Sequence, residues 1–221
     1  MRNKANYCPA GAFRANFTAP TFQPSRFALN HLAHFHLSFN EPGLVVGNWA
    51  GDVVKGNDWQ QYPPDVQRGI RLHRTIDAFT DAHPATHRLS GQIRAFAGRY
   101  AGPVGDVLRD HFLSVCWPEF SGQPLQDFAN GVYNILTERN LDLPPVLQER
   151  TPRMIAANWL MGYEQLHELV FVLERLQRRI RNQALDIAGL CHFVEQEREA
   201  LMADFRVFYP EITAAARAAS Q

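Results

Sequence analysis

The sequence predicts an all-α protein that folds as a single-domain helical bundle. Apolar residues recur at spacings of three and four along most of the chain after Asn30, which is typical of the buried face of a helix. Prolines stand where such patterns begin, and no alternating stretch is long enough for a convincing strand. With 221 residues the chain can bury a substantial core of its own.

Several helices can be placed by their prolines and their apolar spacing. Pro64 suits a first helical turn, and that helix is expected over 64–82. Pro103 opens a second helix, over 103–117. A third helix over 124–138 carries apolar residues at three-to-four spacing. For the rest of the chain we expect a turn at 141–145, helices over 152–160, 163–181 and 186–208, and an interruption at Pro210 before the Ala-rich end.

Residues 1–28 differ from the rest of the chain. They show no apolar periodicity, and no acidic residue precedes Glu41. A secretory signal would need a continuous apolar core, which this stretch lacks. Its basic composition would suit a transit peptide, but no amphipathic helix is evident. We therefore expect residues 1–28 to be a disordered or non-native N-terminal extension, and residues 29–221 to form the helical domain.

Charge and cysteine content narrow the class of protein. Acidic and basic residues number 22 each, so the overall charge indicates neither a nucleic-acid partner nor an anionic membrane. Cys8, Cys116 and Cys191 are odd in number and lack paired spacing, which argues against a disulfide framework or a zinc knuckle. No apolar run reaches the roughly 18 residues of a membrane-spanning helix. A cytoplasmic protein is the simplest interpretation.

The most informative residues are ionisable side chains on the apolar faces of two predicted helices. At about 100° per residue, His73, Asp77 and His111 fall among apolar neighbours. These neighbours are Val66, Ile70 and Ile76 on the first helix, and Val104, Val107, Leu108 and Val115 on the second. Burying one unpaired charge costs several kcal/mol, a large part of a typical net stability of about 5–15 kcal/mol. Such residues need a compensating partner, and a metal ion is the usual one.

Carboxylates and imidazoles from three segments could share one metal ion. His73 and Asp77 are one helical turn apart, so both can reach it. Asp52 closes the segment GNWAGD, whose two glycines allow close backbone approach. Asp110 stands beside His111, at the edge of the apolar face. This ligand set suits manganese, iron, magnesium or zinc, and the lack of thiolates argues against a structural zinc site.

Each of these residues also has a simpler interpretation. A buried histidine is often a hydrogen-bonded core residue, and an isolated helix Asp is often solvated or a cap. His73 and Asp77 could form only a local ion pair. The histidines at the start of the helical region could be further ligands or merely a His-rich helix start: His31, His34 and His36.

Other kinds of chemistry find little support. The sequence has no Gly-x-Ser-x-Gly elbow, no P-loop and no dinucleotide-binding fingerprint. One basic cluster is either a solvated helix face or a surface for an acidic partner: Arg175, Arg178, Arg179 and Arg181.

Six segments together resemble the acyl carrier protein phosphodiesterase family, the hydrolases that remove phosphopantetheine from holo-acyl carrier protein. They are NHLAHFHL (30–37), GNWAGD (47–52), YPPDVQRGIRLHRTIDAFTD (62–81), DHFLSVCW (110–117), PLQDF (124–128) and FYP (208–210). Their order and separations fit, so the resemblance covers the chain from Leu29 onward. Family members begin at the position of Leu29, so residues 1–28 depart from the pattern.

The resemblance implies a helical fold distantly related to the HD-type metal-dependent phosphohydrolases, with manganese (Mn²⁺) as the expected ion. The implied ligands are Asp52, His73, Asp77 and the pair Asp110–His111. This pair has the order Asp-His, whereas the family doublet is usually His-Asp.

The implied reaction is hydrolysis of the phosphodiester that joins a carrier-protein serine to 4′-phosphopantetheine. Asp81, one turn beyond Asp77, is our first candidate to accept a proton from the attacking water. Arg74 suits a phosphate clamp because a guanidinium can contact two phosphate oxygens in one plane. The implied partner is an acyl carrier protein, which is strongly acidic. It would meet either the exposed side of the 64–82 helix (Arg68, Arg71, Arg74) or the cluster at 175–181.

Two alternatives remain open at this point. An HD-like phosphohydrolase that acts on a nucleotide or another small phosphoester would use the same ligands, but it would need base-stacking aromatic residues in a narrow pocket. A non-catalytic helical protein that only binds an acyl carrier protein would keep the basic surface without needing Asp52 or His73.

Overall fold

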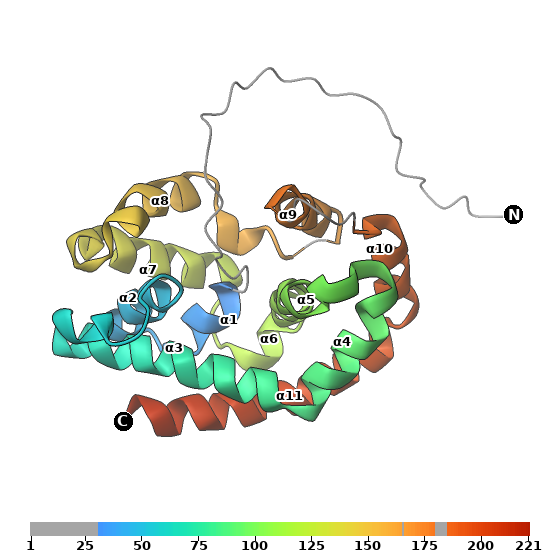
Figure 1. The fold of residues 1–221 in the computed structure, drawn as a ribbon, viewed down its shortest axis with the longest axis horizontal. Helices are drawn as coiled ribbons and strands as arrows, with labels where there is room; N and C mark the ends of the chain where they lie inside the picture. The colour runs from blue at the N-terminus through green and yellow to red at the C-terminus, as the bar shows by residue number, and fades with distance from the viewer. Residues whose placement is uncertain (1–30, 165, 180–184) are drawn as a thin grey trace, which may run out of the picture.

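A computed structural model describes residues 31–164, 166–179 and 185–221. These residues form α-helices and short 3₁₀ helices, and no strand occurs among them (Figure 1). The all-α prediction is therefore confirmed. The expectation for residues 1–28 falls outside the described residues. None of the helices in the described ranges is long and apolar enough to cross a bilayer.

The helices occupy the following residues. The α-helices are α1 (His31–His36), α2 (Pro42–Gly51), α3 (Pro64–Ala82), α4 (Pro84–Ala97), α5 (Ala101–Val115), α6 (Trp117–Phe120), α7 (Leu125–Glu138), α8 (Pro145–Ala156), α9 (Leu166–Arg179), α10 (Ile187–Gln196) and α11 (Arg198–Ser220). The 3₁₀ helices are η1 (Asp58–Gln61), η2 (Gly98–Tyr100), η3 (Asn140–Asp142) and η4 (Trp159–Met161).

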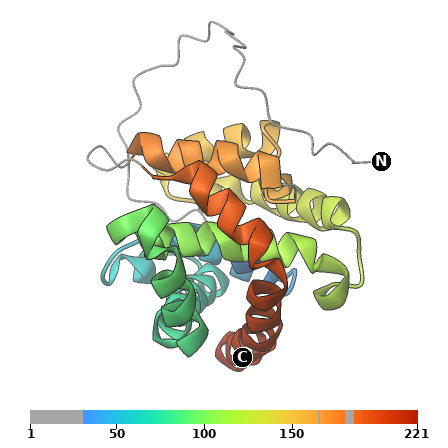
Figure 2. The same ribbon diagram turned by 90° about the vertical axis from the view of Figure 1, so that its right-hand side faces the viewer.

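Helix α5 lies at the centre of the bundle. It packs against α1, α4, α9 and α11, and Figure 2 shows α9 above it and the C-terminal end of α11 below it. Its buried residues include polar ones, among them Arg109, Asp110 and His111. A helix that is buried on every side belongs to the interior. The ionisable side chains of α5 therefore need partners inside the protein.

Helices α2 and α3 pack closely because glycines face each other where they cross. A Cβ atom added to Gly47 would lie 2.1 Å from the carbonyl oxygen of Val66 and 2.6 Å from the Cα of Gly69. A Cβ added to Gly51 would lie 2.3 Å from the ring Cγ of His73. No side chain fits at these distances. The glycines therefore set how near the end of α2 comes to α3.

Two predicted helices agree closely with the structure: the 64–82 helix is α3, and the 124–138 helix is α7 (Leu125–Glu138). Pro42, Pro84 and Pro145 also stand in the first turns of helices. The helix predicted at 152–160 instead begins at Pro145, and it ends at Ala156. The predicted 186–208 helix is divided into α10 and α11.

The interruption predicted at Pro210 is wrong. Helix α11 continues through this proline to Ser220. A proline inside a helix costs about 3 kcal/mol because it removes a backbone hydrogen bond and crowds the preceding turn. Phe208, Tyr209 and Ile212 are buried around it, and their packing offsets that cost.

The glycine contact gives a direct test of the fold. We expect Gly47→Ala to destabilise the protein by about 1–3 kcal/mol, because the new methyl group overpacks against the backbone of α3. The measurement is the free energy of unfolding in urea.

Gly131→Ala is the matched control. Gly131 is also helical, in α7, but nothing lies within 4 Å of its added Cβ. This change should stabilise the protein by up to about 1 kcal/mol, because alanine is the better helix former. A Gly47→Ala variant as stable as the Gly131→Ala variant would show that α2 and α3 do not need this contact.

Candidate metal centre

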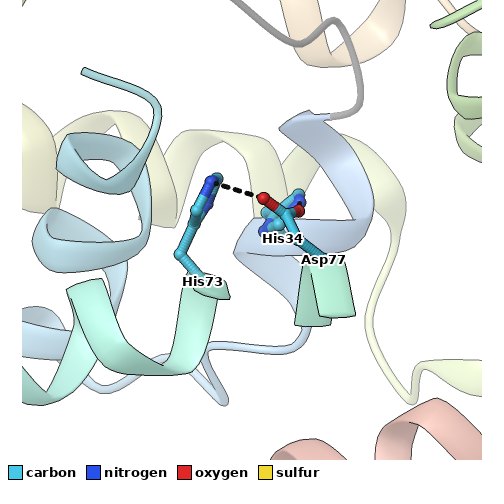
Figure 3. Close-up of side chains that lie close together, drawn as sticks. All are labelled: His34, His73 and Asp77. Atoms are coloured by element: carbon cyan, nitrogen blue, oxygen red, sulfur yellow. Dashed lines mark ion pairs between the residues drawn. The ribbon is translucent and has the colours of Figure 1, made fainter. Parts of the chain in front are cut away.

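Three side chains from two helices converge at one point in the structure. His34 comes from α1, and His73 and Asp77 come from successive turns of α3 (Figure 3). The Nε2 atom of His34 lies 3.3 Å from Oδ1 of Asp77, and the Nε2 atom of His73 lies 3.2 Å from Oδ2 of the same carboxylate. One ligand atom from each residue falls within 4.8 Å of the other two. This spacing is compatible with a divalent metal ion.

Asn48 on α2 determines which nitrogen of each histidine faces the cluster. Its Nδ2 donates hydrogen bonds to the carbonyl oxygen of His34 at 2.8 Å and to Oγ of Ser38 at 3.0 Å. The amide oxygen is therefore the acceptor, and it lies 2.7 Å from Nδ1 of His34 and 3.1 Å from Nδ1 of His73. Both Nδ1 atoms must then carry a hydrogen. Each Nε2 is left to hold either a proton or a metal ion.

The electrostatics of the cluster favour a positive charge at its centre. The side chains of His34 and His73 are 5% and 7% exposed, whereas that of Asp77 is 48% exposed. Burial alone would raise the pKa of Asp77, but the two imidazoles lower it overall. Burial likewise opposes protonation of His34, yet Asp77 raises its pKa. The buried Nε2 of His34 contacts Asp77 as an ion pair, without the geometry of a hydrogen bond. These residues therefore fit a bound cation.

Asp52, at the end of α2, approaches the same nitrogen of His73 as Asp77 does. Its Oδ1 is 3.7 Å from Nε2 of His73, and its Oδ2 is 3.8 Å from Nδ1 of His31. The carboxyl group is buried, and burial raises its pKa although His73, His34 and Arg150 act in the opposite direction. Asp52 therefore lies beside the triad, within the same electrostatic environment.

A cavity of about 320 Å³ opens next to these groups. Three of its polar lining residues are the predicted ligands Asp52, His73 and Asp77, and the other lining residues are Gly51, Val54, Lys55, Gly56 and Arg74. Lys55 donates to the carbonyl oxygen of Asp52 at 2.8 Å, and Arg74 donates to that of Gly56 at 2.9 Å. The cavity therefore combines carboxylates and imidazoles with two cations that could contact an anionic group.

The structure does not bring Asp110 and His111 into this cluster. Asp110 is fully buried, and its two oxygens accept hydrogen bonds at 2.9 Å from the backbone N–H groups of Leu32 and Ala33. Nδ1 of His111 lies 2.7 Å from the carbonyl oxygen of Tyr163. The partners of Asp110 in the structure are therefore backbone groups of the first turn of α1, and burial still raises its pKa to about 7 against the effect of these hydrogen bonds.

Other predicted residues lie away from the cavity. Asp81 is one turn beyond Asp77 on α3, is exposed, and is not among the lining residues. In the basic cluster, Arg178 is exposed, and Arg175 is half-buried with its guanidinium 5.3 Å from the Trp159 ring centre. The side chain of Arg179 and residue Arg181 fall outside the described residues, as does Cys8. Cys116 and Cys191 are free thiols.

Sequence reasoning gave too little weight to His34 and did not find Asn48. His34 sits in a helix of only six residues, too short to show which face is buried. Asn48 is 1% exposed in the otherwise apolar stretch PGLVVGNWAG. A lone amide in an apolar helix is a usable signal, because a buried amide must find hydrogen-bond partners.

The fold and the site define an all-helical protein with a buried histidine–carboxylate centre beside an open cavity. The family model described as acyl carrier protein phosphodiesterase matches residues 29–212. This chain belongs to that family. The match confirms the family resemblance seen in the sequence.

Relatives cover nearly the whole chain. A Yersinia enterocolitica protein named acyl carrier protein phosphodiesterase is 31% identical over 190 residues, which cover 86% of this chain and 98% of that protein. An Escherichia coli protein of the same name is 33% identical over 190 residues, which cover 85% of this chain and 97% of that protein. No solved structure matches this chain significantly.

Two buried histidines provide a test of the triad. We expect His34→Ala to weaken Mn²⁺ binding by more than about 100-fold, because it removes a direct ligand rather than an outer partner. The measurement is isothermal titration with Mn²⁺, with circular dichroism to confirm helical content.

His111→Ala is the matched control. This histidine is also buried, but its hydrogen bond goes to Tyr163 outside the triad. The control should lose stability and keep its affinity for Mn²⁺. If both variants fold and lose Mn²⁺ affinity equally, His34 is not a ligand of the ion and the assignment of the triad as the metal site is wrong.

Proposed function

We propose that this protein hydrolyses the phosphodiester between 4′-phosphopantetheine and a serine of holo-acyl carrier protein, releasing apo-acyl carrier protein. Family membership supports the substrate class. The observation that carries the chemistry is the His34, His73 and Asp77 triad at the edge of a cavity that also holds Lys55 and Arg74. A phosphodiester carries one negative charge, and both cationic side chains and a Lewis acid would stabilise the further charge that develops on its oxygens during hydrolysis.

The ligands we propose for a divalent cation, with Mn²⁺ as the first candidate, are His34, His73 and Asp77, with Asp52 adjacent. When bound, such a cation would stabilise negative charge on the phosphate oxygens. Asn48 keeps both imidazoles turned toward it, as outer hydrogen-bond partners do in metal sites. Arg74 has its guanidinium oriented by a backbone carbonyl, and it would contact the phosphate together with Lys55.

Asp81 remains our proposal for the group that accepts a proton from the attacking water. It lies on the same helix as His73 and Asp77, one turn beyond Asp77, and its side chain is exposed to solvent. Asp110 and His111 have other partners, and we do not include them among the ligands of the proposed ion.

The cavity lining bears on the nucleotide alternative. Among the described residues, no Phe, Tyr or Trp side chain lines the cavity beside the triad. A nucleotide site would be expected to provide an aromatic face for the base. The lining therefore favours a phosphoester without a base to stack.

The activity is tested directly on the carrier protein. Incubation of the purified protein with holo-acyl carrier protein and Mn²⁺ should convert the carrier to its apo form, seen by mass spectrometry as loss of the prosthetic group. His73→Ala should lower this rate by orders of magnitude while the helices persist, because the triad loses one ligand. A folded His73→Ala variant that keeps full activity would rule out the site, and binding without turnover by the unaltered protein would favour the non-catalytic alternative.

The carrier protein must contact the rim of the cavity, because the phosphate is attached to one of its serine side chains. Arg71 is exposed on α3, three residues before the lining residue Arg74, and its guanidinium lies 5.1 Å from the Trp59 ring centre. Arg68 on the same side is already paired with Glu41 at 2.9 Å. Arg71 makes no ion pair with another described residue, so it is our first candidate on the predicted surface to meet an acidic partner.

Charge reversal tests this surface. We expect Arg71→Glu to raise KM several-fold with little change in kcat, and the effect should shrink at high salt because exposed charges are screened beyond about 8–10 Å. The control is Arg94→Glu, which reverses an exposed arginine of α4. Equal KM values for both variants at low salt would place the docking surface elsewhere, with Arg178 as the next candidate.

A further inference from the structure

A second and larger cavity is separate from the one beside the triad and has no role in the function proposed above. Its volume is about 830 Å³, which is within the usual range for a small-molecule site. Its walls come from the end of α1 and the turn after it, from α6 and the start of α7, and from the second half of α11. It shares no lining residue with the cavity beside the triad. A ligand bound here would therefore occupy a site of its own.

Rings form much of the lining of this larger cavity. The ring centres of Phe120 and Tyr209 lie 4.8 Å apart, and those of His36 and Phe128 lie 5.7 Å apart. Phe128 and Tyr209 belong to the sequence segments 124–128 and 208–210, which the proposed function does not use. Such walls offer flat apolar faces, against which another aromatic ring can pack.

The inner polar groups of the cavity are paired with one another. Nδ1 of His36 lies 2.8 Å from the hydroxyl oxygen of Tyr209, and the same imidazole donates to the backbone carbonyl of Phe120. Burial and the nearby charge of Arg217 lower the pKa of His36 to about 4, so the imidazole is neutral at neutral pH. These groups join α1, α6 and α11 into a fixed wall without adding charge to it.

Arg217 gives the cavity a positive charge that no described residue balances. Glu119 also lines the cavity, but both of its carboxylate oxygens accept hydrogen bonds from Arg206 at 2.8 Å. Arg217 is exposed, makes no ion pair with another described residue, and has its guanidinium 4.6 Å from the Phe39 ring centre. A guanidinium that stacks on a ring keeps its N–H edge available. This edge can bind a carboxylate through two parallel hydrogen bonds.

The backbone that carries the Phe39 ring is in an uncommon conformation. Phe39 and Asn40 have φ angles of 53° and 58°. This left-handed region is tolerated by asparagine but is unfavourable for a bulky residue such as phenylalanine. Strain that the surrounding structure must offset is common at binding sites. The strained residue here is the one whose ring holds Arg217 at the cavity.

We propose that this cavity binds a small aromatic carboxylate, whose ring packs among the aromatic side chains and whose anionic group meets Arg217. The positive charge of Arg217 favours an anion, and the surrounding rings favour a flat apolar body. This inference does not depend on the metal centre or on the proposed reaction, because none of the residues assigned to them lines the cavity.

The test measures the Kd of 2-naphthoate, an aromatic carboxylate, by isothermal titration of the full chain. We expect a Kd of about 1 mM or tighter, which is ordinary for a ligand of this size, and weaker binding of the uncharged 2-naphthamide. Arg217→Gln should weaken the binding of 2-naphthoate by about 10-fold, because it removes a charge-assisted contact. The same variant should leave the binding of 2-naphthamide unchanged.

Phe39→Asn tests the aromatic wall. It removes the ring, and asparagine readily adopts a left-handed backbone, so the variant should keep its helical content and bind both ligands more weakly. Arg99→Gln is the matched control for Arg217→Gln. Arg99 is also exposed and lies 5.0 Å from a ring centre, that of Tyr100, but it does not line the cavity. This control should leave both affinities unchanged.

Three results would overturn the inference. The first is no binding of 2-naphthoate by the unaltered protein at millimolar concentration. The second is the same affinity for 2-naphthoate in Arg217→Gln and Arg99→Gln. The third is tighter binding of decanoate than of 2-naphthoate, which would show that the cavity fits an extended apolar chain rather than an aromatic ring.

Discussion

The site depends on the close approach of α2 and α3. At Gly47 and Gly69 the two backbones touch, since an added Cβ at either position would lie within 2.7 Å of the other glycine's Cα. This contact costs helix propensity, because glycine is about 1 kcal/mol less favourable than alanine in a helix interior. In return, Asn48 and Asp52 at the end of α2 come within reach of His73 on α3. Side chains at the crossing would separate the two helices and move these groups apart.

The polar groups of the site illustrate how a helical core compensates buried charge in different ways. The carboxylate of Asp77 faces two imidazoles, and that of Asp106 faces Arg109. Asp110 is satisfied by backbone N–H groups at the start of α1, where the positive end of the helix favours a carboxylate. By fixing α1, Asp110 also helps to place His34, which directly follows Ala33 in the chain. Its contribution to the site is therefore indirect, through the position of a helix.

The sequence predicts which site residues of one helix share a face, but it does not predict contacts between segments that are far apart in the chain. The spacing of His73 and Asp77 predicts that both reach one ligand, because residues four apart in a helix share a face. Asp52 was found through the glycines beside it, which do mark a close backbone contact. The position of Asp110 on an apolar face predicts that it needs a partner but not which one, and in the structure backbone N–H groups of α1 approach it. Which helix end would reach Asp110 is a property of the packed fold, and α1 is too short for periodicity to reveal its orientation. The distant relation to HD-type phosphohydrolases stays a prediction.

The division of the site between helices and a loop has a chemical consequence. His34, Asn48, His73 and Asp77 lie on helices, so their relative positions are fixed before any substrate binds. Lys55 and Gly56 lie in the connection between α2 and η1, and Arg74 is tied to that connection through the carbonyl of Gly56. Groups that stabilise developing charge are most effective when they need not move during the reaction. Residues that bind a partner are commonly carried by loops on a rigid scaffold. The helices therefore hold the triad and Asn48, and the connection that closes one side of the cavity holds Lys55, one of the two cations that we propose to contact a phosphate. A change in the loop can then alter which phosphoester is bound without moving the triad, whereas a change at the α2–α3 crossing disturbs both.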